Sequence, residues 1–172
     1  MARRKIILSL IIGLSGLASV PQAAANTAPT KVGSYSDWTV YTRGTGQGRI
    51  CYALTEPTAK APQTVRHGDI YFLVSNWASG AASEQPSLLT GFPVKTTRAP
   101  KARVGRTSIT MYGAGNEAFI ADSADERELV SKMRAGASMT VEAVSSRGTE
   151  VSYNFSLKGV TAALREARRR CS

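Results

Sequence analysis

Histidine and cysteine are the scarcest chemically active residues in this chain of 172 residues, which contains one His and two Cys. One His excludes any metal or catalytic site that requires two histidines. Two widely separated cysteines exclude a zinc finger, a C-x-x-C redox centre and a disulfide-dense miniprotein. Apolar residues make up 42% of the chain and charged residues 20%, which is typical of a globular protein rather than a disordered one. The length suits a single domain.

Acidic residues are also few, because 12 Asp and Glu stand against 22 Lys and Arg, a formal charge of +10. The one long apolar run covers residues 6–18; three basic residues precede it, and Pro21 and three alanines at 23–25 follow it. This order predicts a secretory signal peptide over residues 1–25. The alternative is a retained membrane anchor, but a run of 13 residues is short for the ~20 that a span requires.

Removal of the signal peptide leaves 19 basic and 12 acidic residues, a charge of +7. Export also decides how the two cysteines are interpreted, since Cys51 and Cys171 both lie in the mature part. An oxidising compartment favours a disulfide between them. The alternative is a pair of buried free thiols.

Strand patterns separated by short turns dominate the mature chain. Residues 26–34 are small and polar and predict a flexible lead-in, while 56–69 and the basic stretch 95–103 predict loops. The GTGQG run at 44–48 is interpreted as a hairpin loop rather than a phosphate loop, because a strand and not a helix follows it. The apolar run 70–77 predicts a central strand buried on both faces. Strands are predicted at 37–42, 49–55, 70–77, 87–94, 104–113, 116–121, 138–146 and 150–157.

Two helices are predicted late in the chain. Ser123 and Glu126 form a capping box at the start of the first, and Gly136 follows its end as the C′ residue. The second covers residues 159–172, and Cys171 lies on its single apolar stripe with Val160, Leu164 and Ala167. A Cys51–Cys171 bridge would therefore attach this helix to the face of the strand that carries Cys51 and Ala53.

Together these patterns predict a mainly β protein. We expect a single antiparallel β-sandwich or barrel-like domain over residues 35–172, with about eight strands and two α-helices in the C-terminal third.

Catalytic constellations are lacking. His67 is the one candidate general base and Asp69 is near it in sequence, but no G-x-S-x-G motif follows in the mature chain, so a solvated turn histidine is favoured over a hydrolase triad. We therefore predict that His67→Ala leaves function unchanged. The acidic residues around 122–128 suit the positive end of a helix better than a glycosidase or a calcium loop. Four aromatic residues are interpreted as core in preference to a ligand platform: Trp38, Tyr71, Phe72 and Trp77.

One basic segment stands out, because five cations fall within 12 residues with no acid among them: Lys95, Arg98, Lys101, Arg103 and Arg106. The plain interpretation is a solvated loop. The functional interpretation is a surface that contacts an anionic envelope component, such as lipid headgroups or a polyanionic sugar.

Several short motifs recur in an order that is similar to a known family: SDWTVY (36–41), ICYAL (50–54), EP (56–57), LTGFPVK (89–95), ADERELVSKMRAG (124–136), SSRGTEVSYNFSLKG (145–159) and TAALREARRRC (161–171). They resemble the invasion-associated locus B family of exported Gram-negative proteins. The resemblance implies a β-rich periplasmic or surface-exposed protein with no known enzymatic activity, whose namesake is linked to host-cell invasion. Some relatives carry a further Cys shortly after the DW element; this chain has Tyr41 and Thr42 there, so only the Cys51/Cys171 pair carries over.

We therefore expect a non-enzymatic exported protein, periplasmic or secreted, that binds or tethers a partner. The expected partner is an anionic envelope component or another envelope protein. No cofactor, metal site, nucleic-acid partner or later transmembrane span is expected. Two alternatives remain: a secreted effector that contacts host-cell surfaces, and a periplasmic enzyme of an unrecognised type.

Overall fold

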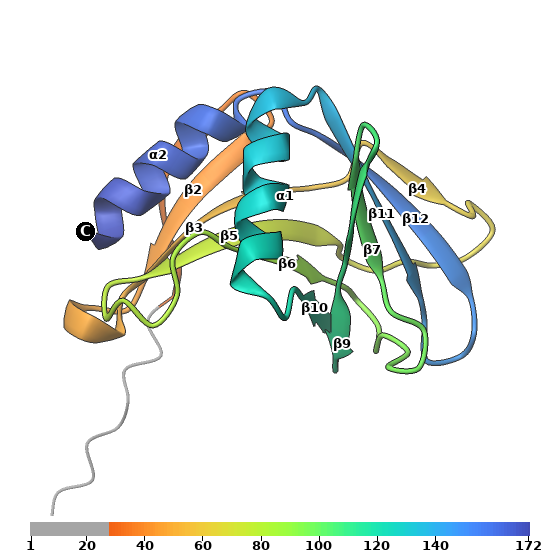
Figure 1. Ribbon diagram of the computed structural model, residues 1–172. Coiled ribbons are helices and arrows are strands. Elements are labelled where there is room, and N and C mark those ends of the chain that lie inside the picture. Colours follow the sequence, from red (N-terminus) through yellow and green to blue (C-terminus); the bar gives the residue numbers. More distant parts are fainter. Residues whose placement is uncertain (1–27) are drawn as a thin grey trace, which may run out of the picture.

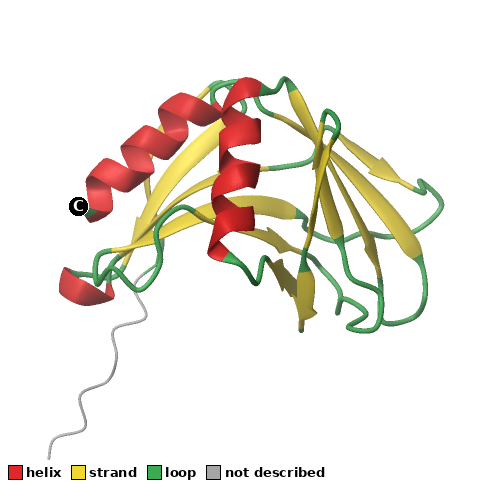
Figure 2. Ribbon diagram, in the orientation of Figure 1, coloured by secondary structure: helices red, strands yellow, loops and turns green. Residues whose placement is uncertain are grey.

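The computed structural model describes residues 28–172, and these form a mainly β structure with two α-helices (Figure 2). The strands belong to two sheets, and all pairings within them are antiparallel. The arrangement is an open sandwich, not a closed barrel, which confirms the predicted fold class. The predicted signal peptide lies outside the described residues.

The seven-stranded sheet contains, in spatial order, β1 (Thr30–Tyr35), β2 (Trp38–Arg43), β3 (Ile50–Thr55), β5 (Tyr71–Trp77), β6 (Gln85–Leu89), β10 (Glu117–Phe119) and β9 (Tyr112–Ala114). The five-stranded sheet contains β4 (Ala59–Ala61), β12 (Glu150–Ser156), β11 (Ser138–Val144), β7 (Lys101–Val104) and β8 (Thr107–Thr110). The helices are α1 (Ser123–Ala135) and α2 (Val160–Cys171), with a short 3-10 turn η1 (Gly46–Gly48) between β2 and β3.

The prediction of about eight strands is wrong, because the described residues contain twelve. The predicted lead-in over 26–34 is wrong from Thr30 onward, since β1 pairs with β2; residues 26–27 are not described. The predicted loop at 56–69 contains β4, which pairs with β12. The single strand expected at 104–113 is divided between the end of β7, the whole of β8 and the start of β9, because Gly105 has a φ of +56° and reverses the chain between β7 and β8. These short strands have few residues in which an alternating pattern can be recognised.

The core lies on one face of the seven-stranded sheet, which we call the inner face. There α2 contacts β1, β2, β3 and β5, whereas α1 contacts β6 of this sheet and β7 and β8 of the other (Figure 1). The five-stranded sheet closes the same side, and the rings of Phe72 on β5 and Phe155 on β12 lie 5.7 Å apart between centroids. Trp38 is fully buried and its Nε1 donates to the carbonyl oxygen of Ser156, 3.0 Å away. One buried cluster thus joins both sheets and both helices.

Strand β5 is central, as predicted, but it is not buried on both faces. Phe72 and Val74 point into the core, whereas Tyr71, Leu73 and Trp77 alternate with them and stay partly exposed. Both helices and the second sheet cover only the inner face, so an apolar strand here does not imply two covered faces.

The ends of α1 differ from the predicted caps. Asp122, not Ser123, is the N-cap, and its carboxylate accepts from the backbone N–H of Ala124 at 2.6 Å. Gly136 ends the helix with a φ of −91°, so it is not the left-handed C′ residue that the sequence predicted. A Cβ built at Gly136 would lie 2.6 Å from Cγ1 of Val104, so close packing against β7 explains this glycine.

The start of α2 is placed by a close backbone approach. Gly159 precedes the helix with a φ of +90°, and a Cβ there would lie 2.0 Å from the carbonyl oxygen of Tyr35. Only glycine permits this contact between the start of α2 and the end of β1. From that point the helix runs across the inner face, with Val160, Ala163 and Leu164 buried.

The far end of α2 is attached covalently, because Cys171 forms a disulfide with Cys51 on β3, with Cα atoms 5.8 Å apart. Cys51 and Ala53 are both fully buried beneath the helix. The structure therefore confirms the predicted disulfide and the face of β3 to which it attaches α2.

Removal of the bridge should weaken the whole fold. The disulfide joins residues 120 apart, and a loop of that size is expected to contribute roughly 4–5 kcal/mol by restricting the unfolded chain. We expect Cys51→Ala/Cys171→Ala to lower the free energy of unfolding by this amount in urea titrations of the two proteins. A decrease below about 1 kcal/mol would show that packing alone holds α2.

Candidate functional site

The basic segment is only partly a loop. Lys95 and Arg98 lie before β7, Lys101 and Arg103 lie on β7, and Arg106 lies in the turn after it. The predicted loop over 95–103 is therefore wrong from Lys101 onward. The sequence Lys-Ala-Arg-Val alternates, so Ala102 and Val104 enter the core while the two cations point to solvent.

The fold brings two carboxylates to this basic surface. Arg98 pairs with Glu150 at 3.0 Å, and Arg103 pairs with Glu142 at 3.7 Å. The side chains in both pairs are at least half exposed, so each pair adds little to stability. In the described residues no ion pair involves Lys95, Lys101 or Arg106.

A hollow of about 500 Å³ adjoins the basic surface. Its walls come from β4, β7, β11, β12 and the loop before β7, and they carry Arg98 and Lys101 together with Glu142 and Glu150. Sequence reasoning missed both carboxylates because they lie far along the chain, on or beside β11 and β12. The β7–β11 register sets Glu142 opposite Lys101, and the β11–β12 register sets Glu150 opposite Val144 at the same hollow.

His67 is not the solvated turn histidine that the sequence favoured, because it is 91% buried, with a relative exposure of 9%. Its Nε2 lies 2.9 Å from the carbonyl oxygen of Pro62 and its Nδ1 lies 3.0 Å from the hydroxyl of Tyr153. A carbonyl only accepts, so Nε2 carries a proton and donates it to Pro62, while Nδ1 shares a hydrogen bond with the Tyr153 hydroxyl. Burial raises the pKa of the Tyr153 hydroxyl, which keeps it protonated.

This arrangement leaves His67 without the geometry of a general base. The ring borders a hollow of about 450 Å³ that Ser145 and Ser146 also line, and none of the described residues that line it is acidic. The Ser145 hydroxyl accepts from the backbone N–H of Thr149 at 3.1 Å and has no bond to His67. One ring nitrogen closes the loop between β4 and β5 onto Pro62 and the other joins this loop to β12, so the histidine has a structural role.

The four aromatic residues that we interpreted as core separate into two groups. Trp38 and Phe72 are fully buried in the core, as expected. Tyr71 and Trp77 lie on the outer face of the seven-stranded sheet and are partly exposed, so the interpretation is wrong for these two.

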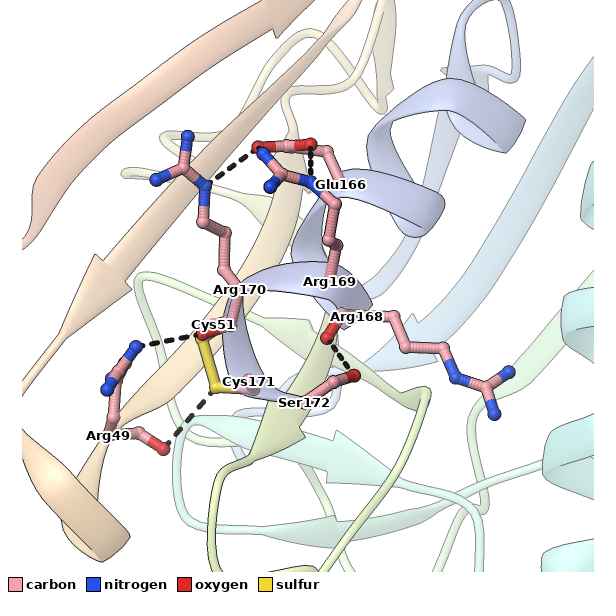
Figure 3. A network of polar contacts seen from close by, with 8 residues as sticks. All are labelled: Arg49, Cys51, Glu166, Arg168, Arg169, Arg170, Cys171 and Ser172. Carbon is pink, nitrogen blue, oxygen red and sulfur yellow. Dashed lines mark hydrogen bonds and ion pairs between the residues drawn. A yellow bond between two sulfur atoms is a disulfide. The ribbon is translucent and has the colours of Figure 1, made fainter.

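The C-terminal helix carries a compact polar network beside the disulfide (Figure 3). The carboxylate of Glu166 accepts from Arg169 at 2.7 and 2.9 Å and from Arg170 at 2.7 Å. These hydrogen bonds lower the pKa of Glu166 from 4.5 to about 2. Arg49, next to β3, donates to the carbonyl oxygen of Arg170 at 3.0 Å, which gives the end of the helix a second link to this sheet. The same residues therefore fasten α2, and the single carboxylate of Glu166 balances only one of the two arginine charges.

Neither metal binding nor a membrane span is indicated by residues 28–172. No group of three His, Cys, Asp or Glu side chains in this range converges on a point where a metal ion would fit. None of the helices in the same range is both long and apolar enough to cross a bilayer.

The buried histidine should matter for stability. We expect His67→Ala to lower the free energy of unfolding by about 1–3 kcal/mol, because it leaves the Tyr153 hydroxyl and the Pro62 carbonyl without partners. Tyr153→Phe removes one of the same hydrogen bonds, so the double variant should lose less than the two single losses combined. Chemical denaturation of the native protein, the two single variants and the double variant measures this coupling. Strictly additive losses of unfolding free energy would contradict the hydrogen bond between His67 and Tyr153.

The Glu166 network predicts a pH dependence. Because folding lowers the pKa of Glu166 from 4.5 to about 2, its stabilising contribution is complete above pH 4.5 and is lost as the pH falls towards 2. The difference in unfolding free energy between the native protein and Glu166→Gln should therefore shrink over this range. Glu128→Gln, at an exposed carboxylate of α1, should show no such trend. If the unfolding free energies of both variants change with pH in the same way, the lowered pKa of Glu166 is contradicted.

One of three comparisons with known proteins returns a match for this chain. A search of curated proteins and a search of solved structures return no match. Among protein families, residues 38–168 match the Invasion associated locus B (IalB) protein family. The match covers most of the chain, from the buried Trp38 on β2 to Arg168 near the end of α2. The chain belongs to the Invasion associated locus B family.

Proposed function

We propose that this protein is an exported, non-enzymatic binding protein that attaches to an anionic component of the cell envelope. The observation that carries the proposal is the basic surface of Lys95, Lys101 and Arg106, which have no ion-pair partner in the described residues. Lys101 and Arg106 are exposed and Lys95 is half-buried, and surface cations of this kind attract polyanions over a long range. The alternating β7 strand keeps Lys101 on the solvent side.

Two further observations support the proposal. The disulfide between Cys51 and Cys171 suits an oxidising compartment, as the predicted export requires. His67, which was the one candidate base, is occupied by Pro62 and Tyr153. Both observations support partner recognition, and the proposed partner carries phosphate, sulfate or carboxylate groups.

The test removes the three cations that lack partners and leaves both ion pairs intact. We expect Lys95→Ser/Lys101→Thr/Arg106→Ser to bind vesicles of anionic phospholipid at least about tenfold more weakly than the native protein in 0.1 M salt. In 1 M salt the two proteins should bind equally, because the Debye length falls from about 10 Å to about 3 Å. Vesicle co-sedimentation over a salt series measures both effects.

A matched control separates a local surface from net charge. Lys132→Ser/Lys158→Ser/Arg165→Ser removes the same charge from three scattered exposed positions. This control should bind nearly as well as the native protein. Equal loss in both triple variants would show that total charge, not the basic surface, attracts the vesicles. Native binding by the first variant at low salt would overturn the proposal.

A further inference from the structure

The outer face of the seven-stranded sheet, opposite the core, is unusually apolar. Both helices and the second sheet pack on the inner face, so an antiparallel sheet of this kind is expected to present polar side chains outward. Instead most of the outward positions carry partly exposed aromatic and aliphatic residues, with Thr39, Ser75 and Ser87 as polar positions between them. The apolar ones are Tyr41, Ile50, Tyr52, Leu54, Tyr71, Leu73, Trp77, Leu89 and Phe119. We call this set the outer apolar face.

The registers show that these side chains form one continuous surface. Tyr41 lies opposite Tyr52, and their rings stack with centroids 5.7 Å apart. On the next pair of strands Leu54 lies opposite Leu73. Single apolar residues on a surface need no explanation, but a contiguous apolar surface over several strands is typical of an interface.

Basic side chains border one corner of the outer apolar face. Lys31 on β1 lies opposite Tyr41, and Arg43 at the end of β2 lies opposite Ile50, so both point to the outer side and both are exposed. Burial raises the pKa of Tyr52 and the nearby charge of Arg43 opposes that rise, which places Arg43 at the margin of the apolar surface. We call these two residues the basic corner.

Acidic side chains border the diagonally opposite corner. Glu117 on β10 lies opposite Leu89, and Glu56 follows the end of β3. Asp69 stands two residues before Tyr71 in the chain, and the charges of Asp69 and Glu56 add to burial in raising the pKa of Tyr71. We call Glu56, Asp69 and Glu117 the acidic corner.

We propose that the outer apolar face is the interface with a second copy of this chain, packed face to face about a two-fold axis. An axis that lies in the plane of the interface, between the two corners, sets the basic corner of each copy against the acidic corner of the other. The surface is therefore complementary to itself in charge as well as in apolar character. A neutral partner such as a polysaccharide would use the aromatic rings but would leave both charged corners unexplained.

The dimensions of the outer apolar face indicate how strongly the two copies should associate. Six strands from β1 to β10 span about 24 Å, and the outward residues cover at most about 20 Å, along β5, the longest of these strands. The footprint is therefore below roughly 500 Å² per copy, smaller than the ~800 Å² per partner of a standard interface. We therefore expect a reversible dimer whose population changes between about 1 and about 200 μM protein.

The test reverses the charge of one corner at a time in the mature protein. Lys31→Glu/Arg43→Glu sets acid against acid in both contacts of the dimer, and Glu56→Lys/Asp69→Lys sets base against base. Each variant alone should be monomeric over the concentration range in sedimentation velocity, with a dissociation constant at least about tenfold higher than that of the native protein. An equimolar mixture of the two should dimerise again, since both contacts of the mixed dimer join opposite charges.

Recovery on mixing is a readout that misfolding cannot produce. Lys132→Glu/Arg147→Glu is the matched control, because it makes the same charge change at exposed positions away from the face, and it should dimerise as the native protein does. Leu54→Thr/Leu73→Thr should dissociate the dimer without a change in circular dichroism. A native protein that is monomeric at about 200 μM, or corner variants that still dimerise, would overturn the proposal. So would a monomer that binds a neutral polysaccharide through Tyr52 and Trp77.

The proposed dimer and the proposed anion binding can be tested independently of each other. The basic surface of Lys95, Lys101 and Arg106 lies on and around β7 of the other sheet. The corner variants leave those residues unchanged and should bind anionic vesicles as the native protein does in the monomer range. The triple variant at the basic surface should dimerise normally.

Discussion

The packing of α2 on the inner face of the seven-stranded sheet is the contact on which the rest of the structure depends. Gly159 places the start of the helix against the backbone of Tyr35, and the Cys51–Cys171 bridge attaches its end to β3. Between these two points the helix buries a stripe of small and branched side chains over the sheet. Helix α2 therefore covers the half of the seven-stranded sheet that the five-stranded sheet does not reach. The core lies on the inner face of the seven-stranded sheet only.

A one-sided core produces two exposed sheet surfaces of different chemistry. The five-stranded sheet presents charged and hydroxyl side chains around β7, whereas the seven-stranded sheet presents aromatic and aliphatic ones. His67, the one candidate general base in the sequence, links the segment before β5 to Tyr153 on β12. This buried polar contact stabilises the fold, and both sheet surfaces stay exposed.

Sequence reasoning succeeded where a pattern is local or where the number of candidates is small. The alternation of Val151, Tyr153 and Phe155 identified β12 and its buried face, and two cysteines permit one intramolecular pairing only. It failed where the deciding partner is distant. His67 looked solvated because its neighbours in sequence are polar, yet its ring is buried against Tyr153, which lies 86 residues away. Lys101 and Arg103 looked like loop cations because β7 has only four residues.

The sequence by itself determined the fold class, the positions of the two helices, the disulfide and the resemblance to the family, because each follows from periodicity, residue counts or motif order along the chain. Only the tertiary structure decided which charges neutralise one another and which apolar residues remain outside the core. Glu142 and Glu150 reach the basic surface through strand pairing, and Tyr41, Tyr52 and Leu73 remain outside because no described element covers the outer face. Alternation along a strand distinguishes two faces, but only the packing of other elements determines which of them is covered.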